Sequence, residues 1–449
     1  MSSHDSNSAV RLFATQDLPK VAFGQGSYIT DVDGKRYIDG SSGPATYCIG
    51  HGNGEVNDAI KAQLDQIAHG YRYMFTSDSL EDLQAIIARN SGGGLTHSVL
   101  VSGGSEAVES CLKIALQYQT AIGQKSRRRF IARNRSWHGN TLGALSISGF
   151  EQRRAPYVGA LIEASFMSAA NIYRPPADIP VEQIGDYCAN ELDKEICKLG
   201  AETVCAFVFE PVVGAAGGAV PAPPGYSKKM REVCDKHGVL MIADEVMCGV
   251  GRTGDWRSLS FDDVVPDVMS IAKGLGGGYM PLGASVCQQH IADTLFEKNG
   301  VILTGHTFAG HTAACAAGVA VQKIIEREGL VEKVKRDGEW MLGELHSMLG
   351  QHPYIGDIRG RGFFIGVEFV KDRESKEPFD PELSVFTKIG REGFANGLIT
   401  YPVGGNVDGN RGDITIIAPP YNATRAELTE ILDKFDITVK AVFSEVNKS

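Results

Sequence analysis

The amino-acid sequence predicts an α/β protein whose main sheet is mostly parallel. Short apolar runs recur along the chain, each is continuous rather than alternating, and helical periodicity fills the intervals between them. A continuous apolar run too short for a helix is typical of a strand buried on both faces of a parallel sheet. Strands that alternate with helices indicate βαβ units. The five predicted strands cover residues 98–101, 129–132, 204–209, 239–243 and 268–272.

The N-terminal part predicts a polar arm, a hairpin and two helices. Residues 1–20 are polar, which indicates either a mobile segment or an arm that becomes ordered on a partner subunit. Two short apolar-aromatic runs, 28–30 and 36–38, flank an Asp-Gly pair, which is a strong signal for a two-residue hairpin turn. Apolar residues at helical spacing then predict helices over residues 55–67 and 79–89.

A glycine-containing loop follows the strand at 98–101. It reads SGGSEAVE, and the helix after it is expected to begin near Ser105. Backbone N–H groups at a helix N-terminus attract anions, so the loop suits a phosphate group. The alternative is an ordinary helix start in which the Ser105 side chain caps the helix. The packing face of this helix is predicted to carry Val108, Cys111, Leu112, Ala115 and Gln119.

Polar and aromatic residues follow two further strands at their carboxyl ends. The strand at 129–132 leads to Trp137-His138-Gly139, where an indole face can lie along a planar ring and the glycine permits close approach. The alternative for Trp137 is a place in the core. The strand at 204–209 ends at Glu210. Between these strands lies a proline-containing excursion and then an amphipathic helix, predicted over residues 181–198.

The stretch from Val239 to Gly278 places an acid and a lysine at the ends of neighbouring strands. The first strand stops at Asp244-Glu245, and the second stops at Lys273 before a run of glycines. Ligands of open α/β sheets bind beyond the carboxyl ends of the strands, so both charges should reach one place. That pair suggests pyridoxal phosphate (PLP), with a Schiff base on the lysine and the acid on the pyridinium nitrogen. The alternatives are a helix cap and a solvated loop lysine.

The C-terminal third mixes helices and strands in a way typical of a separate α+β domain. Thr424 and Glu427 form the outline of a capping box before the last helix. The remaining predicted elements are helices over residues 312–327, 326–350 and 381–396, and strands over 365–370 and 413–418.

Composition narrows the class of protein. Hydrophobic residues make up 43% and charged residues 22% of the 449 residues, which is ordinary for a globular chain and unlike a disordered one. The net charge of -10 disfavours a nucleic-acid partner. Nine scattered cysteines without a CxxC pair indicate reduced thiols rather than disulfides or a zinc site, so no metal is expected. No membrane-length apolar run or signal peptide is present, and a cytoplasmic location without membrane contact is expected.

Six motifs in this order resemble the class III, or ω-type, aminotransferases of PLP fold type I. They are SGGSEAVE, the aromatic-HG step, EPVVG, ADEVMCGVGRTG, AKGLGGG and GHTFAGH, within a similarity that spans roughly residues 25 to 440. The resemblance implies a large PLP-binding domain with a mostly parallel, seven-stranded sheet and a small α+β domain. It implies boundaries at 1–50 (arm and hairpin contributing to the small domain), 51–325 (large domain) and 326–449 (C-terminal small domain). It also implies a homodimer with active sites at the interface and leaves open whether dimers pair into tetramers.

The same resemblance assigns roles to individual residues. Lys273 corresponds to the Schiff-base lysine and Asp244 to the partner of the pyridine nitrogen. Val246 and Trp137 correspond to the side chains on the two ring faces, although relatives commonly carry Tyr or Phe at the Trp137 position. The other implied cofactor residues are Gly104 and Ser105 at the phosphate, Thr307 reaching the phosphate from the neighbouring subunit, Glu210 in the network around the ring, and His138 near it.

These assignments imply transamination between an amine donor and a keto acid, in a ping-pong sequence through pyridoxamine phosphate. The lysine must then act as a neutral base, so its pKa is expected to be depressed. Relatives that act on ornithine or γ-aminobutyrate carry Glu and Arg where this chain has Ala215 and Ile416, which disfavours those branches. An ω-amine or amino-acid donor with pyruvate as acceptor is therefore the hypothesis. Candidate substrate contacts are Ala45, Tyr47, Tyr73, Tyr157 and Arg411, and the last can also be a solvated loop residue.

Three other functions are compatible with the same residues. A class III aminomutase uses the same lysine and aspartate but needs no second substrate. A racemase or decarboxylase on this scaffold would be distinguished by its product. A non-catalytic protein that retains the fold would bind the cofactor without a half-reaction.

Overall fold

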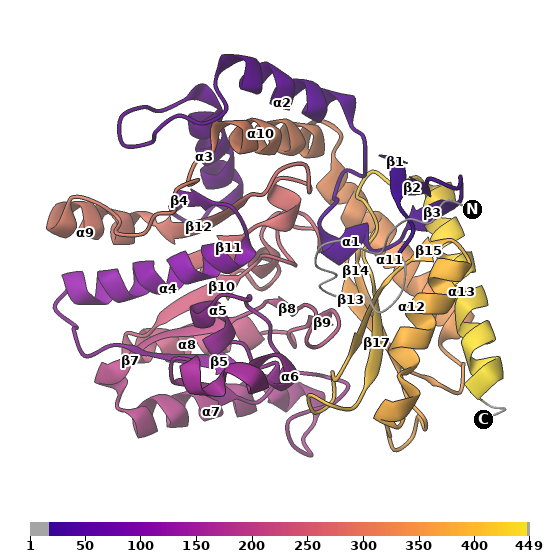
Figure 1. The fold of residues 1–449 in the computed structure, drawn as a ribbon. Coiled ribbons are helices and arrows are strands. Elements are labelled where there is room, and N and C mark those ends of the chain that lie inside the picture. The colour runs from indigo at the N-terminus through magenta and orange to yellow at the C-terminus, as the bar shows by residue number, and fades with distance from the viewer. Residues whose placement is uncertain (1–17, 447–449) are drawn as a thin grey trace.

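The computed structural model describes residues 18–446 and is built around a seven-stranded sheet (Figure 1). All neighbours in the sheet run parallel except β12, which is antiparallel to both β11 and β4. The strands in spatial order are β4 (Leu95–Val101), β12 (Gly283–Gln288), β11 (Val268–Ile271), β10 (Leu240–Asp244), β7 (Val204–Phe209), β5 (Arg129–Arg133) and β6 (Ala164–Met167). The predicted α/β class with a mostly parallel sheet is confirmed.

Both faces of this sheet are buried, as the continuous apolar runs predicted. In β7, Ala206 and Val208 pack in one apolar layer with α4, whereas Phe207 and Phe209 pack in the opposite layer with α7 and α8. Successive side chains of a strand point to opposite faces, so a strand covered on both sides has no place for an alternating polar residue. The helices of these two layers are α4 (Gly104–Ala121), α7 (Ile184–Leu199) and α8 (Tyr226–His237).

The predicted strands are all present, with ends that shift by up to three residues. The sequence did not reveal β6 or β12. The segment that forms β12 reads GASVCQ, in which small and polar residues dilute the apolar signal, although the strand is buried in the sheet. Residues 272–282 connect β11 to β12 without an α-helix, and β12 runs antiparallel to β11.

Most helices around the large sheet begin and end within two residues of the predicted positions. The segment predicted as one helix over residues 181–198 instead begins with a 3₁₀ turn, Val181–Gln183, before α7 starts at Ile184. The remaining elements of this part are α1 (Ser42–Ala45), α2 (Gly54–Gln66), α3 (Asp78–Ser91), α5 (Leu142–Ser146), α6 (Glu151–Arg154), α9 (Gln289–Asn299), α10 (Thr312–Arg327), β8 (Val212–Val213), β9 (Val220–Pro221), and 3₁₀ turns at Ala155–Ala160, Ala201–Thr203, Ser258–Asp262 and Lys273–Leu275.

The C-terminal segment forms a smaller α+β unit beside the large sheet (Figure 1). Its sheet has the order β13-β14-β17-β16 and shares an apolar core with its helices. The elements are β13 (Ile355–Arg361), β14 (Phe364–Phe369), β15 (Leu398–Ile399), β16 (Tyr401–Gly404), β17 (Asp413–Ile417), α11 (Leu330–Leu349), α12 (Val385–Ala395), α13 (Arg425–Val446) and the 3₁₀ turn Pro381–Leu383.

Two predicted C-terminal helices begin later than expected because of left-handed residues. Gly329 has φ +58°, so α11 starts only at Leu330, and Ser384 has φ +44°, which separates the 3₁₀ turn from α12. The capping box before α13 is confirmed, since the Thr424 backbone N–H donates to the Glu427 carboxylate at 2.6 Å and the Glu427 N–H donates to Thr424 Oγ1 at 3.2 Å.

The N-terminal hairpin joins the C-terminal unit. The hairpin strands β2 (Tyr28–Asp31) and β3 (Arg36–Asp39) are as predicted, β1 (Val21–Gln25) pairs outside β2, and β15 adds in parallel to β3. Ile38 lies in the same apolar cluster as α11 and α13. The three domain boundaries remain a prediction, and most of the predicted N-terminal arm lies outside the described residues. Between residues 18 and 446, no helix has the length and apolar character needed to cross a membrane.

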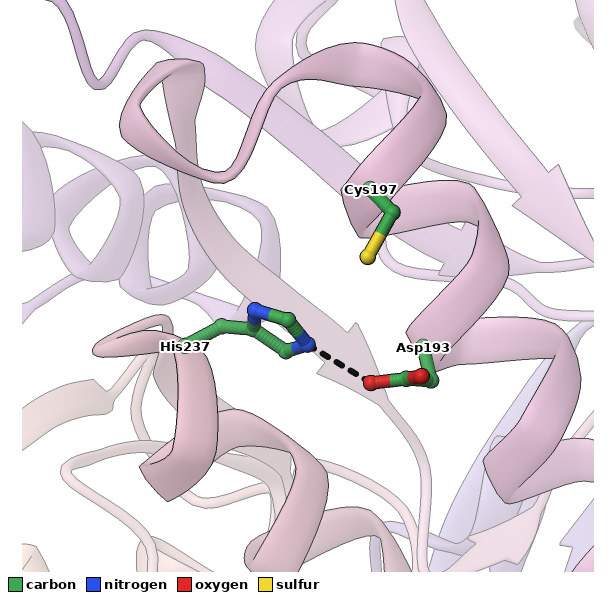
Figure 2. A group of neighbouring side chains, drawn as sticks. All are labelled: Asp193, Cys197 and His237. Atoms are coloured by element: carbon green, nitrogen blue, oxygen red, sulfur yellow. Dashed lines mark hydrogen bonds and ion pairs between the residues drawn. The ribbon is translucent and has the colours of Figure 1, made fainter.

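One group of polar side chains joins α7 to α8 on the outside of the sheet (Figure 2). His237 Nε2 lies 2.6 Å from Asp193 Oδ1, and Cys197 extends from the next turn of α7. These three residue types can bind a metal ion. However, the Lys236 ammonium also lies 2.6 Å from the same Asp193 oxygen, so the positive charge of this lysine already balances the Asp193 carboxylate. The group therefore forms a salt-bridge cluster between two helices.

Two glycines of α11 provide a test of how α11 packs on the C-terminal sheet. A Cβ at Gly338 would overlap the backbone of Gly362, whereas a Cβ at Gly343 would meet nothing within 4 Å. We expect Gly338→Ala to lower the free energy of unfolding by about 1–3 kcal/mol through overpacking. Gly343→Ala should raise it by about 0.5–1 kcal/mol because alanine favours the helix. Denaturant titration of both variants checks this, and equal effects at the two sites would contradict the packing.

Candidate active site

A cavity of about 440 Å³ lies beyond the carboxyl ends of the parallel strands. Its walls come from residues at or shortly after the ends of β4, β5, β7, β10 and β11 and from the loop that contains Tyr47. Eight of the nine predicted cofactor residues line it, namely Gly104, Ser105, Trp137, His138, Glu210, Asp244, Val246 and Lys273. The sheet thus brings together side chains that are far apart in the sequence, as the topology predicted.

Asp244 is the last residue of β10, and hydrogen bonds hold both of its oxygens. Its Oδ1 accepts from the Val246 backbone N–H at 3.0 Å and from Ser270 Oγ at 3.1 Å. Its Oδ2 lies 2.8 Å from His138 Nδ1. The Asp244 side chain is only 4% exposed, so the carboxylate is rigid and shielded from water except where it faces the cavity.

Lys273 follows β11 and begins a 3₁₀ turn in a left-handed conformation, with φ +47°. Its Nζ donates to the Pro44 carbonyl at 2.6 Å, and no salt bridge to it is found within residues 18–446. Burial lowers the pKa of the Lys273 amine to about 8; Arg252 lowers it further, while Asp244 and Glu210 act in the opposite direction. The direction of this shift is the one expected from the sequence for a lysine that must act as a neutral base.

The N-terminus of α4 forms one end of the cavity. Gly103 occupies the N-cap position and no side chain caps the helix, so the alternative in which Ser105 is the cap is wrong. Ser105 Oγ instead accepts from the Asn140 backbone N–H at 2.9 Å. A Cβ at Gly139, which has φ +143°, would lie 2.6 Å from Ser105 Oγ. The two loops therefore approach each other as closely as glycine permits.

Trp137 and Val246 both border the cavity, and Glu210 ties the Trp137 loop to β7. The Glu210 carboxylate accepts from the backbone N–H groups of Trp137 at 2.9 Å and Gly214 at 2.7 Å. Burial raises the pKa of the Glu210 carboxyl. A Cβ at Gly104 would lie 2.8 Å from Val246 Cγ1, so the glycine lets the N-terminus of α4 approach Val246.

The remaining predicted residues divide between this cavity and other places. Tyr47 lines the cavity, and Ala45 is buried beside it, next to Pro44. Thr307 and Tyr73 instead border a separate cavity of about 430 Å³. Arg411 is on the surface, where its Nε donates to Asp408 at 2.6 Å, and Tyr157 is half exposed on a 3₁₀ turn; those two stand away from the cavity lining.

Sequence reasoning missed three residues that shape the site. Ser270 supports Asp244 and was visible as the one polar residue of an otherwise apolar strand. Ser148 Oγ accepts from the His138 N–H at 2.8 Å and so fixes the loop of that histidine. Pro44 contributes only its carbonyl to Lys273, and a backbone contact of this kind leaves no signal in the sequence.

The side chains present fit PLP. The lysine amine has a carbonyl but no carboxylate as a partner, the helix end has no side-chain cap, and buried His138 Nε2 has no hydrogen-bond partner in the described protein. A carboxylate, an amine and a helix N-terminus thus face one cavity of the size that small-molecule sites have. They suit a pyridine nitrogen, an aldehyde and a phosphate respectively.

Comparisons with known proteins agree with this arrangement. The family model for aminotransferase class-III matches residues 14–439. The uncharacterized aminotransferase YodT of Bacillus subtilis (strain 168) is 40% identical over 430 residues, which cover 96% of this chain and 97% of that protein. An amine transaminase from an uncultivated Pseudomonas species, solved in its PLP-bound form, has a TM-score of 0.89 at 31% identity and covers 99% of this chain and 100% of its own.

An (S)-enantioselective omega-transaminase from Thermomicrobium roseum has the same TM-score of 0.89 at 31% identity, with 96% of each chain covered. The match therefore extends over the large sheet, the cavity and the C-terminal unit together. The chain belongs to the class III aminotransferases, PLP-dependent enzymes of fold type I.

Proposed function

We propose that this aminotransferase moves an amino group from an ω-amine or amino-acid donor to a keto acid, with pyruvate as the preferred acceptor. The observation that carries the proposal is the meeting of Lys273 and Asp244 in one cavity, with the lysine free of any counter-ion among the described residues. The similarity to an amine transaminase and an omega-transaminase supports an amine donor. Ala215 and Ile416 argue against the carboxylate switch of the ornithine and γ-aminobutyrate branches.

The chemistry divides between the cofactor and the chain. When bound, PLP supplies the aldehyde carbon that takes up the amino group and a ring that draws electrons from the substrate. Asp244 would hold a proton at the pyridine nitrogen, and its hydrogen bonds to Ser270, His138 and the Val246 N–H keep its carboxylate in place. Lys273, once its Nζ is neutral, removes the proton from the substrate carbon and later returns one.

Other residues are proposed to bind and orient the cofactor and the substrate. The N–H groups at the start of α4, around Gly104 and Ser105, bind the phosphate. Val246 and Trp137, which line the cavity, would hold the two faces of the ring, and Glu210 fixes the Trp137 backbone. Tyr47 and Ala45 form the substrate wall next to Lys273. Arg411 remains a candidate for the acceptor carboxylate, and it would have to leave Asp408 to act.

We also propose a homodimer whose active sites lie at the interface. Six large apolar side chains on two adjoining segments are exposed by more than half: Tyr71, Tyr73, Met74, Phe75, Leu303 and Phe308. Contiguous exposed apolar surface of this kind marks a protein interface. Thr307 lies within the same segments and away from its own chain's cavity, as a residue that serves the neighbouring subunit should. A cytoplasmic location is part of this proposal.

The proposed function predicts a two-step reaction that can be followed in the cofactor's absorbance. Protein loaded with PLP should lose its visible band when mixed with a suitable ω-amine, and pyruvate should restore that band faster than 2-oxoglutarate or glyoxylate. Lys273→Ala should slow both half-reactions by about a thousandfold or more, because the general base is lost. Turnover of the amine without any keto acid would instead indicate an aminomutase, a racemase or a decarboxylase.

The pKa of Lys273 can be measured directly in the protein without cofactor. Isotope-labelled methyl groups on lysine amines report titration by NMR, and Lys273→Arg assigns the signal by its loss. A lowered pKa means that the amine loses its proton at lower pH, so the midpoint should lie near 8 rather than 10.5. Asp244→Asn removes a negative charge that raises this pKa, so the midpoint should then fall further. A midpoint shared with the exposed lysines would contradict the buried environment.

The proposed interface predicts that one charge disrupts the dimer. Met74→Glu would bury an unpaired carboxylate in the apolar contact, at a cost of several kcal/mol, and should yield monomers by light scattering. PLP binding should weaken in parallel, since Thr307 of the other subunit is lost. Ile437→Glu, a change at an exposed apolar residue of α13 outside this patch, serves as the control and should leave the mass unchanged. A dimeric Met74→Glu variant would place the interface elsewhere.

A further inference from the structure

The turn that carries Lys273 is held from behind by a buried glutamine of α10. Gln322 is 3% exposed, and its Nε2 donates to the carbonyls of Gly274 at 3.0 Å and Leu275 at 3.1 Å. These are the two residues that directly follow Lys273 in its 3₁₀ turn. Gln322 does not line the cavity, so it acts on the site through the backbone.

Every hydrogen-bonding group of this side-chain amide is occupied. Its Oε1 accepts from the indole N–H of Trp256 at 3.1 Å, while the two hydrogens on Nε2 serve the two carbonyls. An indole nitrogen can only donate and a carbonyl can only accept, so the partners fix which end of the amide faces which way. Gln322 is one of few polar residues in a helix of mostly small apolar ones, and a buried amide is stable there because it is fully paired.

The Lys273 turn needs such support because its backbone is strained. A lysine with φ +47° occupies a region that costs about 1–3 kcal/mol and persists only when neighbouring groups enforce it. The Gly274 carbonyl also accepts weakly from Cys48 Sγ at 3.4 Å. The direction in which the Lys273 side chain leaves the backbone therefore depends on how firmly Gly274 and Leu275 are held.

Trp256 connects this support to the segment after Asp244. Its carbonyl accepts from the Val250 N–H at 2.6 Å, and Val250 lies in the loop that leaves β10 beyond Asp244. Contacts through Trp256 and Gln322 thus connect the Lys273 turn to the loop that follows β10. We propose that Gln322, oriented by Trp256, is a positioning residue that sets the attachment geometry of Lys273 for PLP.

A comparison of two cofactor forms separates positioning from general stabilisation. PLP binds through its phosphate and ring and also forms an imine with the Lys273 amine, with release of water. Pyridoxamine phosphate has an amine instead of the aldehyde, so it uses the same phosphate and ring contacts but forms no bond to Lys273. A defect in lysine placement should weaken PLP alone, whereas general damage to the site should weaken both.

The test is Gln322→Met, which keeps the volume and removes all three hydrogen bonds. The Kd for PLP should rise about tenfold or more, as expected for the loss of two hydrogen bonds to the turn. The Kd for pyridoxamine phosphate should stay within about twofold. The pH midpoint of the PLP visible band should also shift, because it reports the environment of the lysine nitrogen.

Two further variants should change the affinity for PLP to different degrees. Trp256→Phe removes only the indole N–H and should produce the same pattern at smaller amplitude. Gln322→Glu places a carboxylate against two carbonyls, so PLP should bind poorly at neutral pH and recover as the pH falls and the acid becomes a donor.

Gln119→Met provides the matched control. Gln119 is also a buried helical glutamine, and it donates to the Cys205 carbonyl at 3.4 Å, away from Lys273. Its loss should lower stability without changing the ratio of the two affinities. If Gln322→Met weakens both cofactor forms equally, or neither, the positioning role is wrong. Failure of the unaltered protein to bind either form would count against the cofactor assignment instead.

Discussion

The parallel pairing of β10 with β11 is the constraint on which the active site depends. In this register Asp244 lies opposite Ser270, and Lys273 follows Ser270 by three residues, just beyond the end of the neighbouring strand. The backbone alone therefore places a carboxylate and an amine at the same edge of the sheet. Because both strands are buried on both faces, neither can slip by one residue without turning a row of apolar side chains to the wrong layer. The core that stabilises the protein therefore also fixes the distance between its two charges.

Strain accumulates around that edge and is held by contacts between loops. Lys273, Ser42 and Ala45 all have positive φ values, and the Lys273 amine bonds to Pro44 between the latter two. Each such residue costs about 1–3 kcal/mol, so the arrangement requires surrounding groups that leave no relaxed alternative. The Asp39 carboxylate, which accepts from the Ser41 and Gly43 N–H groups, is one of them on the loop side. A lysine amine bound only to a carbonyl can leave it at little electrostatic cost, which suits the role proposed for Lys273.

The strands and site residues that could be predicted are those that a single local sequence pattern determines. Continuous apolar runs identified the central strands, and polar residues at their ends identified Asp244, Lys273 and Glu210. The apolar-run pattern did not predict β12, because small and polar residues occupy this buried strand. Helical periodicity placed the start of α12 too early, because that start depends on the left-handed conformation of Ser384. Pro44 and Ser148 were missed because their contribution is a contact between distant segments, a property of the fold rather than of either segment.

The same distinction explains why the reaction class is easier to read than the substrate. Every group needed for the chemistry follows a strand of one sheet, so short motifs in chain order are sufficient to identify it. The surfaces that would select an amine come from elsewhere: the loop of Tyr47, the irregular segment before α5, and the exposed segments around Tyr73 and Thr307. Their relative positions depend on loop packing and, in the proposed dimer, on the neighbouring subunit. Changes there can alter specificity without disturbing the β10–β11 register, which is how one sheet edge can support many donors.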